Sequence, residues 1–64
     1  MSADFHVTDV GSLVMVEPVT DDARAWCARH LPDDAPMWGN SYAVEPRFVE
    51  DILVGIHEEG LSYA

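Results

Sequence analysis

Cys27 is the only cysteine in a chain of 64 residues, and this fact constrains the fold more than any other. A domain of this size buries a thin hydrophobic core and is close to the lower limit for folding without disulfides or metals. An internal disulfide is impossible here, and a single cysteine is typical of a reducing, intracellular setting. We therefore expect one domain over residues 1–64, located in the cytoplasm, with a free energy of unfolding of only a few kcal/mol.

The charge of the chain is strongly negative. Twelve acidic residues oppose three basic ones, all arginine, for a formal net charge of −9. Such a surface repels nucleic-acid phosphates and anionic membranes, and it attracts basic protein surfaces. The apolar share of 48% still predicts a folded chain, and no apolar run approaches the ~20 residues of a membrane span. Composition therefore favours a basic protein as partner, including one that normally binds nucleic acid.

The N-terminal third of the chain predicts a β-hairpin. Residues 5–8 alternate apolar and polar side chains, as a strand with one buried face does. Residues 9–12 have turn chemistry, because Gly11 can adopt the positive φ of a tight turn. Residues 13–17 are β-rich and apolar on both sides, and they end at Pro18, which cannot donate a hydrogen bond to a sheet.

A helix is predicted over residues 21–31. Thr20 is a suitable N-cap, and the two aspartates after it favour the positive end of the helix dipole. Pro32 ends the helix. Side chains at i, i+3, i+4, i+7 and i+8 form one stripe of it: Ala23, Trp26, Cys27, His30 and Leu31.

The second half of the chain predicts a loop, a short strand and a second helix. Residues 32–41 contain two prolines and a Gly-Asn pair, which favour a loop. Residues 42–44 are a short strand candidate, and Pro46 suits the first turn of a helix with a wide apolar face. Gly60 followed by Leu61 predicts a Schellman-type end to that helix.

The expected element order is ββαβα. Both helices need a sheet to cover their apolar faces, which predicts a two-layer α+β domain with both helices on one face of a three-stranded, mostly antiparallel sheet. Placing strand 42–44 beside strand 5–8 makes the sheet fully antiparallel, in the order 2-1-3. The alternative places strand 42–44 beside strand 13–17, in the order 1-2-3, with a parallel pair.

Cys27 and His30 are the candidates for catalysis or metal binding. They lie one helical turn apart, where the histidine could act as a base that converts the cysteine thiol to a thiolate. Alternatively, both side chains could bind zinc with Asp33 or Asp34 as a third ligand. However, a free cysteine on an apolar stripe usually packs as a small hydrophobic side chain. The sequence contains no glycine-rich phosphate loop, nucleophile elbow or His-Asp-Ser set. We therefore expect a non-enzymatic protein without cofactor or metal, and the thiol or metal site remains a third hypothesis.

Eight of the twelve acidic residues occur as adjacent pairs. A solvated face that keeps a small domain soluble is the simplest interpretation, and Arg47 can pair with Glu50 or Asp51 one turn on. Glu58 and Glu59, in contrast, place two negative charges at the negative end of the helix dipole, which is unfavourable and has no evident structural gain. This conflict marks them as a candidate site of partner recognition. The four pairs are Asp21-Asp22, Asp33-Asp34, Glu50-Asp51 and Glu58-Glu59.

Trp38, next to Met37 in the predicted loop, is the remaining candidate. Tryptophan and methionine are enriched at the centres of interfaces, but we expect this tryptophan to fold over the core as a lid. The competing hypothesis for function is a homo-oligomer formed through uncovered apolar strand surface at residues 13–16. The candidate partner-binding residues are Asp33, Asp34, Trp38, Glu50, Asp51, Glu58 and Glu59.

A set of residues spread over most of the chain also carries a resemblance. It comprises Asp9-x-Gly11-Ser12, Pro18-x-Thr20, Ala23, Trp26, Trp38-Gly39, Val44-Glu45-Pro46-Arg47, Ile52, Gly55 and Gly60-Leu61. On these residues the chain resembles short uncharacterised proteins of bacteria, phages and mobile elements, which implies a genomic setting but no activity. In size and acidity it is also similar to anti-CRISPR and anti-restriction proteins. That likeness implies an inhibitor that occupies a nucleic-acid-binding surface of its partner.

Overall fold

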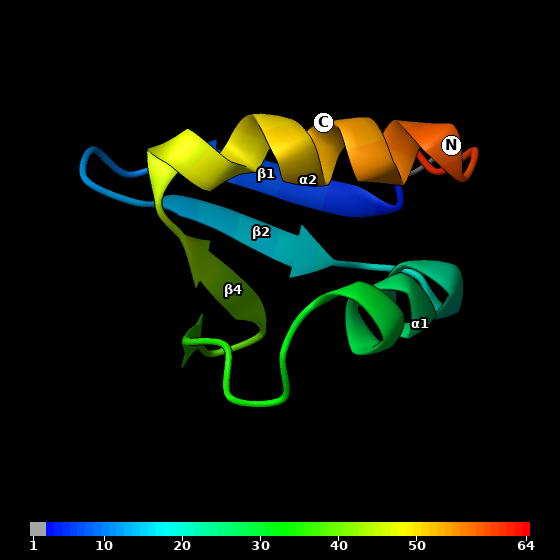
Figure 1. Ribbon diagram of the computed structural model, residues 1–64, viewed down its shortest axis with the longest axis horizontal. Helices are drawn as coiled ribbons and strands as arrows, with labels where there is room; N and C mark the ends of the chain where they lie inside the picture. Colours follow the sequence, from blue (N-terminus) through cyan, green and yellow to red (C-terminus); the bar gives the residue numbers. More distant parts are fainter. Residues whose placement is uncertain (1–2) are drawn as a thin grey trace.

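Two helices and a four-stranded antiparallel sheet make up the fold, which confirms the α+β class. The expected number of three strands is wrong, because residues 37–38 of the predicted loop add a fourth. Figure 1 presents it as a computed structural model that describes residues 3–64, so residues 1–2 of the expected domain lie outside the described residues. The sheet has the order β1-β2-β4-β3. The elements are β1 (Phe5–Asp9), β2 (Val14–Pro18), α1 (Asp21–His30), β3 (Met37–Trp38), β4 (Ser41–Val44) and α2 (Pro46–Glu58).

The β1–β2 hairpin is confirmed. Gly11 adopts a φ of 101°, the conformation for which a glycine was expected in the turn. Its N–H donates to the Asp9 carboxylate over 2.8 Å, which fixes the turn. The register opposes Val7 to Val16 and Phe5 to Pro18, so Phe5, Val7, Val14 and Val16 share the face that meets the core, while Met15 lies on the other face.

The predicted strand order 2-1-3 is wrong. β4, which contains the predicted strand 42–44, pairs with β2 rather than β1, as the alternative order 1-2-3 proposed. The pairing is antiparallel, however, so the parallel pair of that alternative is also wrong. The pair is antiparallel because the chain reverses direction just before β4. Residues 37–38 of the predicted loop form the strand β3, and a turn at Gly39 (φ 61°) leads from it into β4.

The outer edge of β1 is occupied by the C-terminal residues, which explains why β4 lies elsewhere. The Phe5 N–H donates to the Ser62 carbonyl over 3.1 Å, and the Ala64 N–H donates to the Phe5 carbonyl over 3.0 Å. Phe5 and Tyr63 form a parallel bridge.

No helix among the described residues is long and apolar enough to cross a membrane.

Both helices begin and end close to the expected positions. Thr20 caps α1, because its hydroxyl accepts a hydrogen bond of 3.1 Å from the Ala23 N–H. The Schellman end of α2 is confirmed: Gly60 has a φ of 78°, and the Leu61 N–H donates to the Ile56 carbonyl over 3.2 Å.

Within residues 3–64, one core cluster joins the sheet to both helices. Within it the ring of Phe5 meets that of Trp26 edge-on at 5.8 Å. Gly55 of α2 lies so close to Trp26 that a Cβ there would be 3.1 Å from the indole Cζ2. A side chain at position 55 would therefore require Trp26 to shift by a few tenths of an ångström. The buried residues are Phe5, Val14, Val16, Ala23, Trp26, Cys27, Val44 and Ile56.

Candidate protein-binding surface

Cys27 is a buried core residue, 2% exposed, as its place on the apolar stripe indicated. Burial raises the pKa of its thiol to about 11, so the side chain is a neutral thiol at pH 7. His30 stacks on Trp26 with ring centres 4.6 Å apart, and its Nε2 lies 2.6 Å from Glu59. Among the described residues no three potential ligands gather as a metal site. This pair therefore gives no support to a reactive thiolate.

Glu59 has a structural partner in each of two neighbouring side chains. Its Oε1 accepts a hydrogen bond of 2.7 Å from the Arg29 guanidinium, and its Oε2 lies 2.6 Å from His30. The hydrogen bond with His30, followed by the charge of Arg29, lowers the pKa of Glu59 against the opposing effect of burial. The expectation that Glu59 lacks a structural role is therefore wrong, because it joins the C-terminal ends of the two helices.

All three arginines are paired with carboxylates of the same chain. Arg24 lies 3.0 Å from Asp21, Arg29 lies 2.7 Å from Glu59, and Arg47 lies 3.0 Å from Glu45. The expected pairing of Arg47 with Glu50 or Asp51 is thus replaced by a contact two residues earlier. Arg47 also stacks over the ring of Phe48, with its Cζ atom 4.7 Å from the ring centre.

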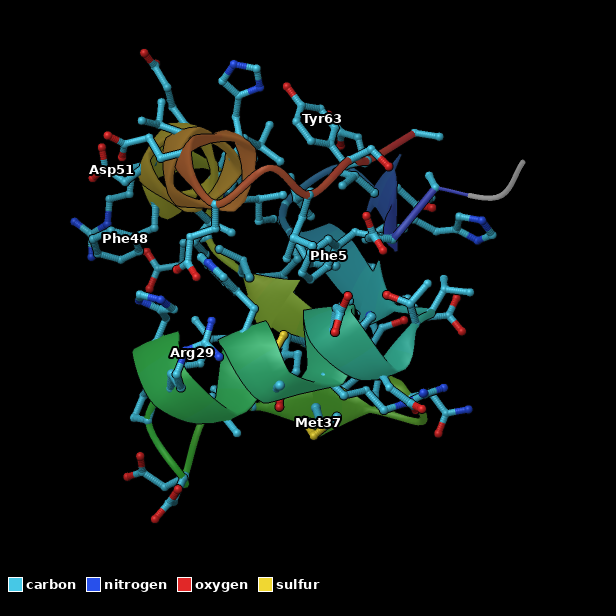
Figure 2. The ribbon with its side chains drawn as sticks, turned by 90° about the vertical axis from the view of Figure 1, so that its right-hand side faces the viewer. Phe5, Arg29, Met37, Phe48, Asp51 and Tyr63 are labelled. Carbon is cyan, nitrogen blue, oxygen red and sulfur yellow. The ribbon has the colours of Figure 1, made fainter. Side chains whose placement is uncertain are left out.

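Five of the seven candidate residues are exposed carboxylates that make no hydrogen bond or ion pair within residues 3–64. They fall into two regions. Glu50, Asp51 and Glu58 lie on the outer surface of α2, and in Figure 2 Asp51 points away from the sheet. The other two, Asp33 and Asp34, lie in the turn between α1 and β3.

Trp38 does not form the expected lid. It lies on β3 with 61% of its surface exposed, beside Met37 at 47%. β3 is at the edge of the sheet, opposite α2 in Figure 1, and Figure 2 likewise places Met37 and Asp51 at opposite ends of the molecule. The predicted set is therefore divided: three acids on α2, the Asp33–Trp38 segment at the other end, and Glu59 between the helices.

A groove runs along α2 on the side of Tyr63, and sequence analysis missed it. It has a volume of about 620 Å³ and is called the α2–Tyr63 groove below. Val49, Leu53, Val54 and Tyr63 supply its apolar surface, and Glu50 and His57 are its polar lining residues. Figure 2 shows Tyr63 beside the helix at the top of the molecule. The groove depends on the bridge between Tyr63 and Phe5 of β1. Residues so far apart in the sequence give no local pattern that predicts such a contact.

Asp4 was also missed, and its role is structural. It accepts a hydrogen bond of 2.7 Å from the Thr20 hydroxyl and one of 3.0 Å from the Ser62 N–H. The first of these bonds, followed by the second, lowers the pKa of Asp4. Asp4 thus links the start of α1 to the C-terminal residues.

No protein-family model matches the chain, and no match is found among curated proteins or solved structures.

Proposed function

We propose that this protein is a non-enzymatic, acidic binding module whose α2 surface binds a basic surface of another protein. One observation carries the proposal: every arginine is paired within the chain, while Glu50, Asp51 and Glu58 have no cationic partner within residues 3–64. The charge of this surface is therefore free to act on a partner.

The spacing of these carboxylates supports recognition rather than solvation alone. Asp51 and Glu58 lie three residues before and four residues after Val54, so they are its neighbours on the helix surface. Seven residues of helix separate the two acids by about 10 Å along the axis. Val54 between them is 52% exposed. An apolar side chain flanked by acids is able to bury surface as well as attract charge.

The partner of this proposal is a protein whose basic surface normally binds nucleic acid. Carboxylates on a rigid helix take the place of phosphates, so the module inhibits its partner by occupying that surface. This is the counter-defence mode implied by the likeness to anti-CRISPR and anti-restriction proteins. Attraction of this kind speeds association and weakens as salt screens it.

Charge reversal on α2, compared with an equal reversal elsewhere, tests the proposal. The tagged protein is used to capture a partner from a bacterial lysate, and the capture is repeated with the double variant Asp51→Lys, Glu58→Lys. The control Asp33→Lys, Asp34→Lys changes the net charge by the same amount at the other end of the molecule. We expect one partner retained by the wild type and the control, lost by the α2 variant, and displaced by added nucleic acid. Capture of no partner, or equal capture by all three, contradicts the proposal.

A second candidate is a homo-oligomer formed through the sheet, and the position of Trp38 favours it. The strand register puts Trp38, Met15 and Ala43 on the sheet face opposite the core, where all three are at least partly exposed. A symmetric dimer through this face would bury them. Light scattering at high micromolar concentration separates the two candidates. A monomer removes the oligomer, while a salt-insensitive dimer that Trp38→Ser dissociates favours it.

A further inference from the structure

The α2–Tyr63 groove combines an apolar surface with an acidic border. Its apolar lining comes from Val49, Leu53 and Val54 of the helix and from Tyr63 of the C-terminal segment. Glu50 and His57 also line the groove. Asp51 and Glu58, which neighbour Val54 on the helix surface outside the groove lining, have no cationic partner within residues 3–64. An occupant must therefore offer apolar side chains and positive charge together.

We infer that the groove binds a basic amphipathic helix of the partner. The inference rests on the proposed function and names the chemistry of the surface that is bound. The lining residues recur along three turns of α2, from Pro46 to His57, so the groove follows the helix axis for about 16 Å. A helix with apolar side chains at i, i+3 or i+4 and i+7 fits such a groove, with lysine or arginine at its flanks meeting the acids.

An extended peptide fits this site less well than a helix. Strand addition requires free backbone N–H and C=O groups at a sheet edge. The nearest edge, that of β1, is already bonded: the Val7 N–H donates to the Ala64 carbonyl over 2.9 Å, and Phe5 bonds to Ser62 and Ala64. An extended peptide therefore cannot add to β1 itself, whereas the side chains of α2 are available to an occupant.

Charge also separates a basic helix from a second copy of this chain. A symmetric dimer through the groove would bring two acidic α2 surfaces together, each belonging to a chain of net charge −9. Like charges placed across an interface destabilise it. A cationic helix reverses the sign of that interaction, so charge complementarity favours it over self-association.

Binding of two synthetic peptides of one composition tests the inference. The first is a helix of leucine and lysine with a leucine stripe, and the second is its scramble, which has the same charge without the stripe. Fluorescence polarisation of the labelled peptides gives both dissociation constants at low and at physiological salt. We expect the striped peptide to bind at least about tenfold more tightly, as burial of one or two apolar side chains provides.

Two variants of equal charge locate the binding site on α2. Val54→Asp and Phe48→Asp change similarly exposed residues (52% and 48%) of one helix, but only Val54 lines the groove. We expect Val54→Asp to weaken the striped peptide about tenfold or more, and Phe48→Asp to leave it unchanged or slightly tighter. If circular dichroism indicates that Val54→Asp perturbs the fold, Val54→Ser removes the apolar contact without added charge and is expected to act in the same direction.

The outcomes separate this inference from the proposed function. Equal binding of the two peptides, or tighter binding by Val54→Asp, overturns the helix inference and leaves recognition by charge standing. Failure of both peptides to bind at low salt also overturns it, while lysate capture by the α2 acids still judges the proposed function. A dimer that Val54→Asp dissociates would assign the groove to a second copy instead.

Discussion

Glu59, at the C-terminal end of α2, accepts a hydrogen bond of 2.7 Å from Arg29 in the last turn of α1. The contact joins two helices that make few other polar contacts in the part of the chain that the structure describes. The contact also distinguishes Glu59 from Glu58, the preceding residue, whose carboxylate has no such partner within residues 3–64. One member of this acidic pair thus serves the fold, and the other is free for a partner.

We expect Glu59→Gln to lower the melting temperature at pH 7, whereas Glu58→Gln leaves it nearly unchanged. The folded-state pKa of Glu59 lies below its unfolded value, so its stabilising effect is present above the unfolded pKa. It is lost as the pH falls through the folded pKa. The difference between wild type and Glu59→Gln should therefore shrink in acid, as thermal melts over a pH series would measure. A difference that grows in acid would contradict the assignment.

We expect Thr20→Val to destabilise the protein by about 1 kcal/mol or more. The Thr20 hydroxyl accepts from the Ala23 N–H over 3.1 Å and donates to Asp4 over 2.7 Å, so both bonds are lost together. Thr20→Ser keeps the hydroxyl and should keep most of the stability. Urea denaturation of the two variants provides the comparison, and equal stability of both would remove the capping role.

Cys27 should react slowly with iodoacetamide at pH 7 until denaturant is added. Burial raises the pKa of its thiol to about 11, so little thiolate is present in the folded protein at pH 7. The side chain is also only 2% exposed, so the reagent reaches it poorly. Cys27→Ala should cost about 1 kcal/mol through the cavity that it leaves, without loss of partner binding. Rapid labelling of the native protein, followed by mass spectrometry, would instead support the thiol hypothesis.

Gly55→Ala should destabilise the protein, although alanine is the better helix former by about 1 kcal/mol. The added Cβ would lie 3.1 Å from Trp26, whose ring is held between Phe5 and His30 and has little room to move. Chemical denaturation measures the sign directly. A stabilised Gly55→Ala protein would mean that Trp26 can yield at no cost.

Local signals in the sequence predicted the hairpin, the Thr20 cap and the Schellman end, because each depends on residues within a few positions of one another. The strand order failed because the pairing of Phe5 with the C-terminal residues joins the two ends of the chain. The same holds for Asp4 and Ser62, which are 58 residues apart, and for Glu59 and Arg29, which are 30 apart. Such contacts leave no periodic or compositional trace.

The candidate site was predictable in kind but not in arrangement. Charge counting identified the acidic residues of α2 and the absence of lysine. It could not assign which carboxylates the arginines neutralise, since Arg29 reaches across to another helix while Arg47 turns to Glu45. The exposure of Trp38 depends on β3, whose two residues are too few to give a strand pattern.

Salt dependence of partner binding is the most direct test of the claim that unpaired α2 carboxylates bind a basic surface. The slope of log Kd against log salt is measured for the captured partner with the wild type, with Asp51→Asn, Glu58→Asn and with the control Asp33→Asn, Asp34→Asn. We expect binding that weakens steeply with salt, a clearly smaller slope for the α2 variant and an unchanged slope for the control. Equal slopes for all three proteins would contradict the claim.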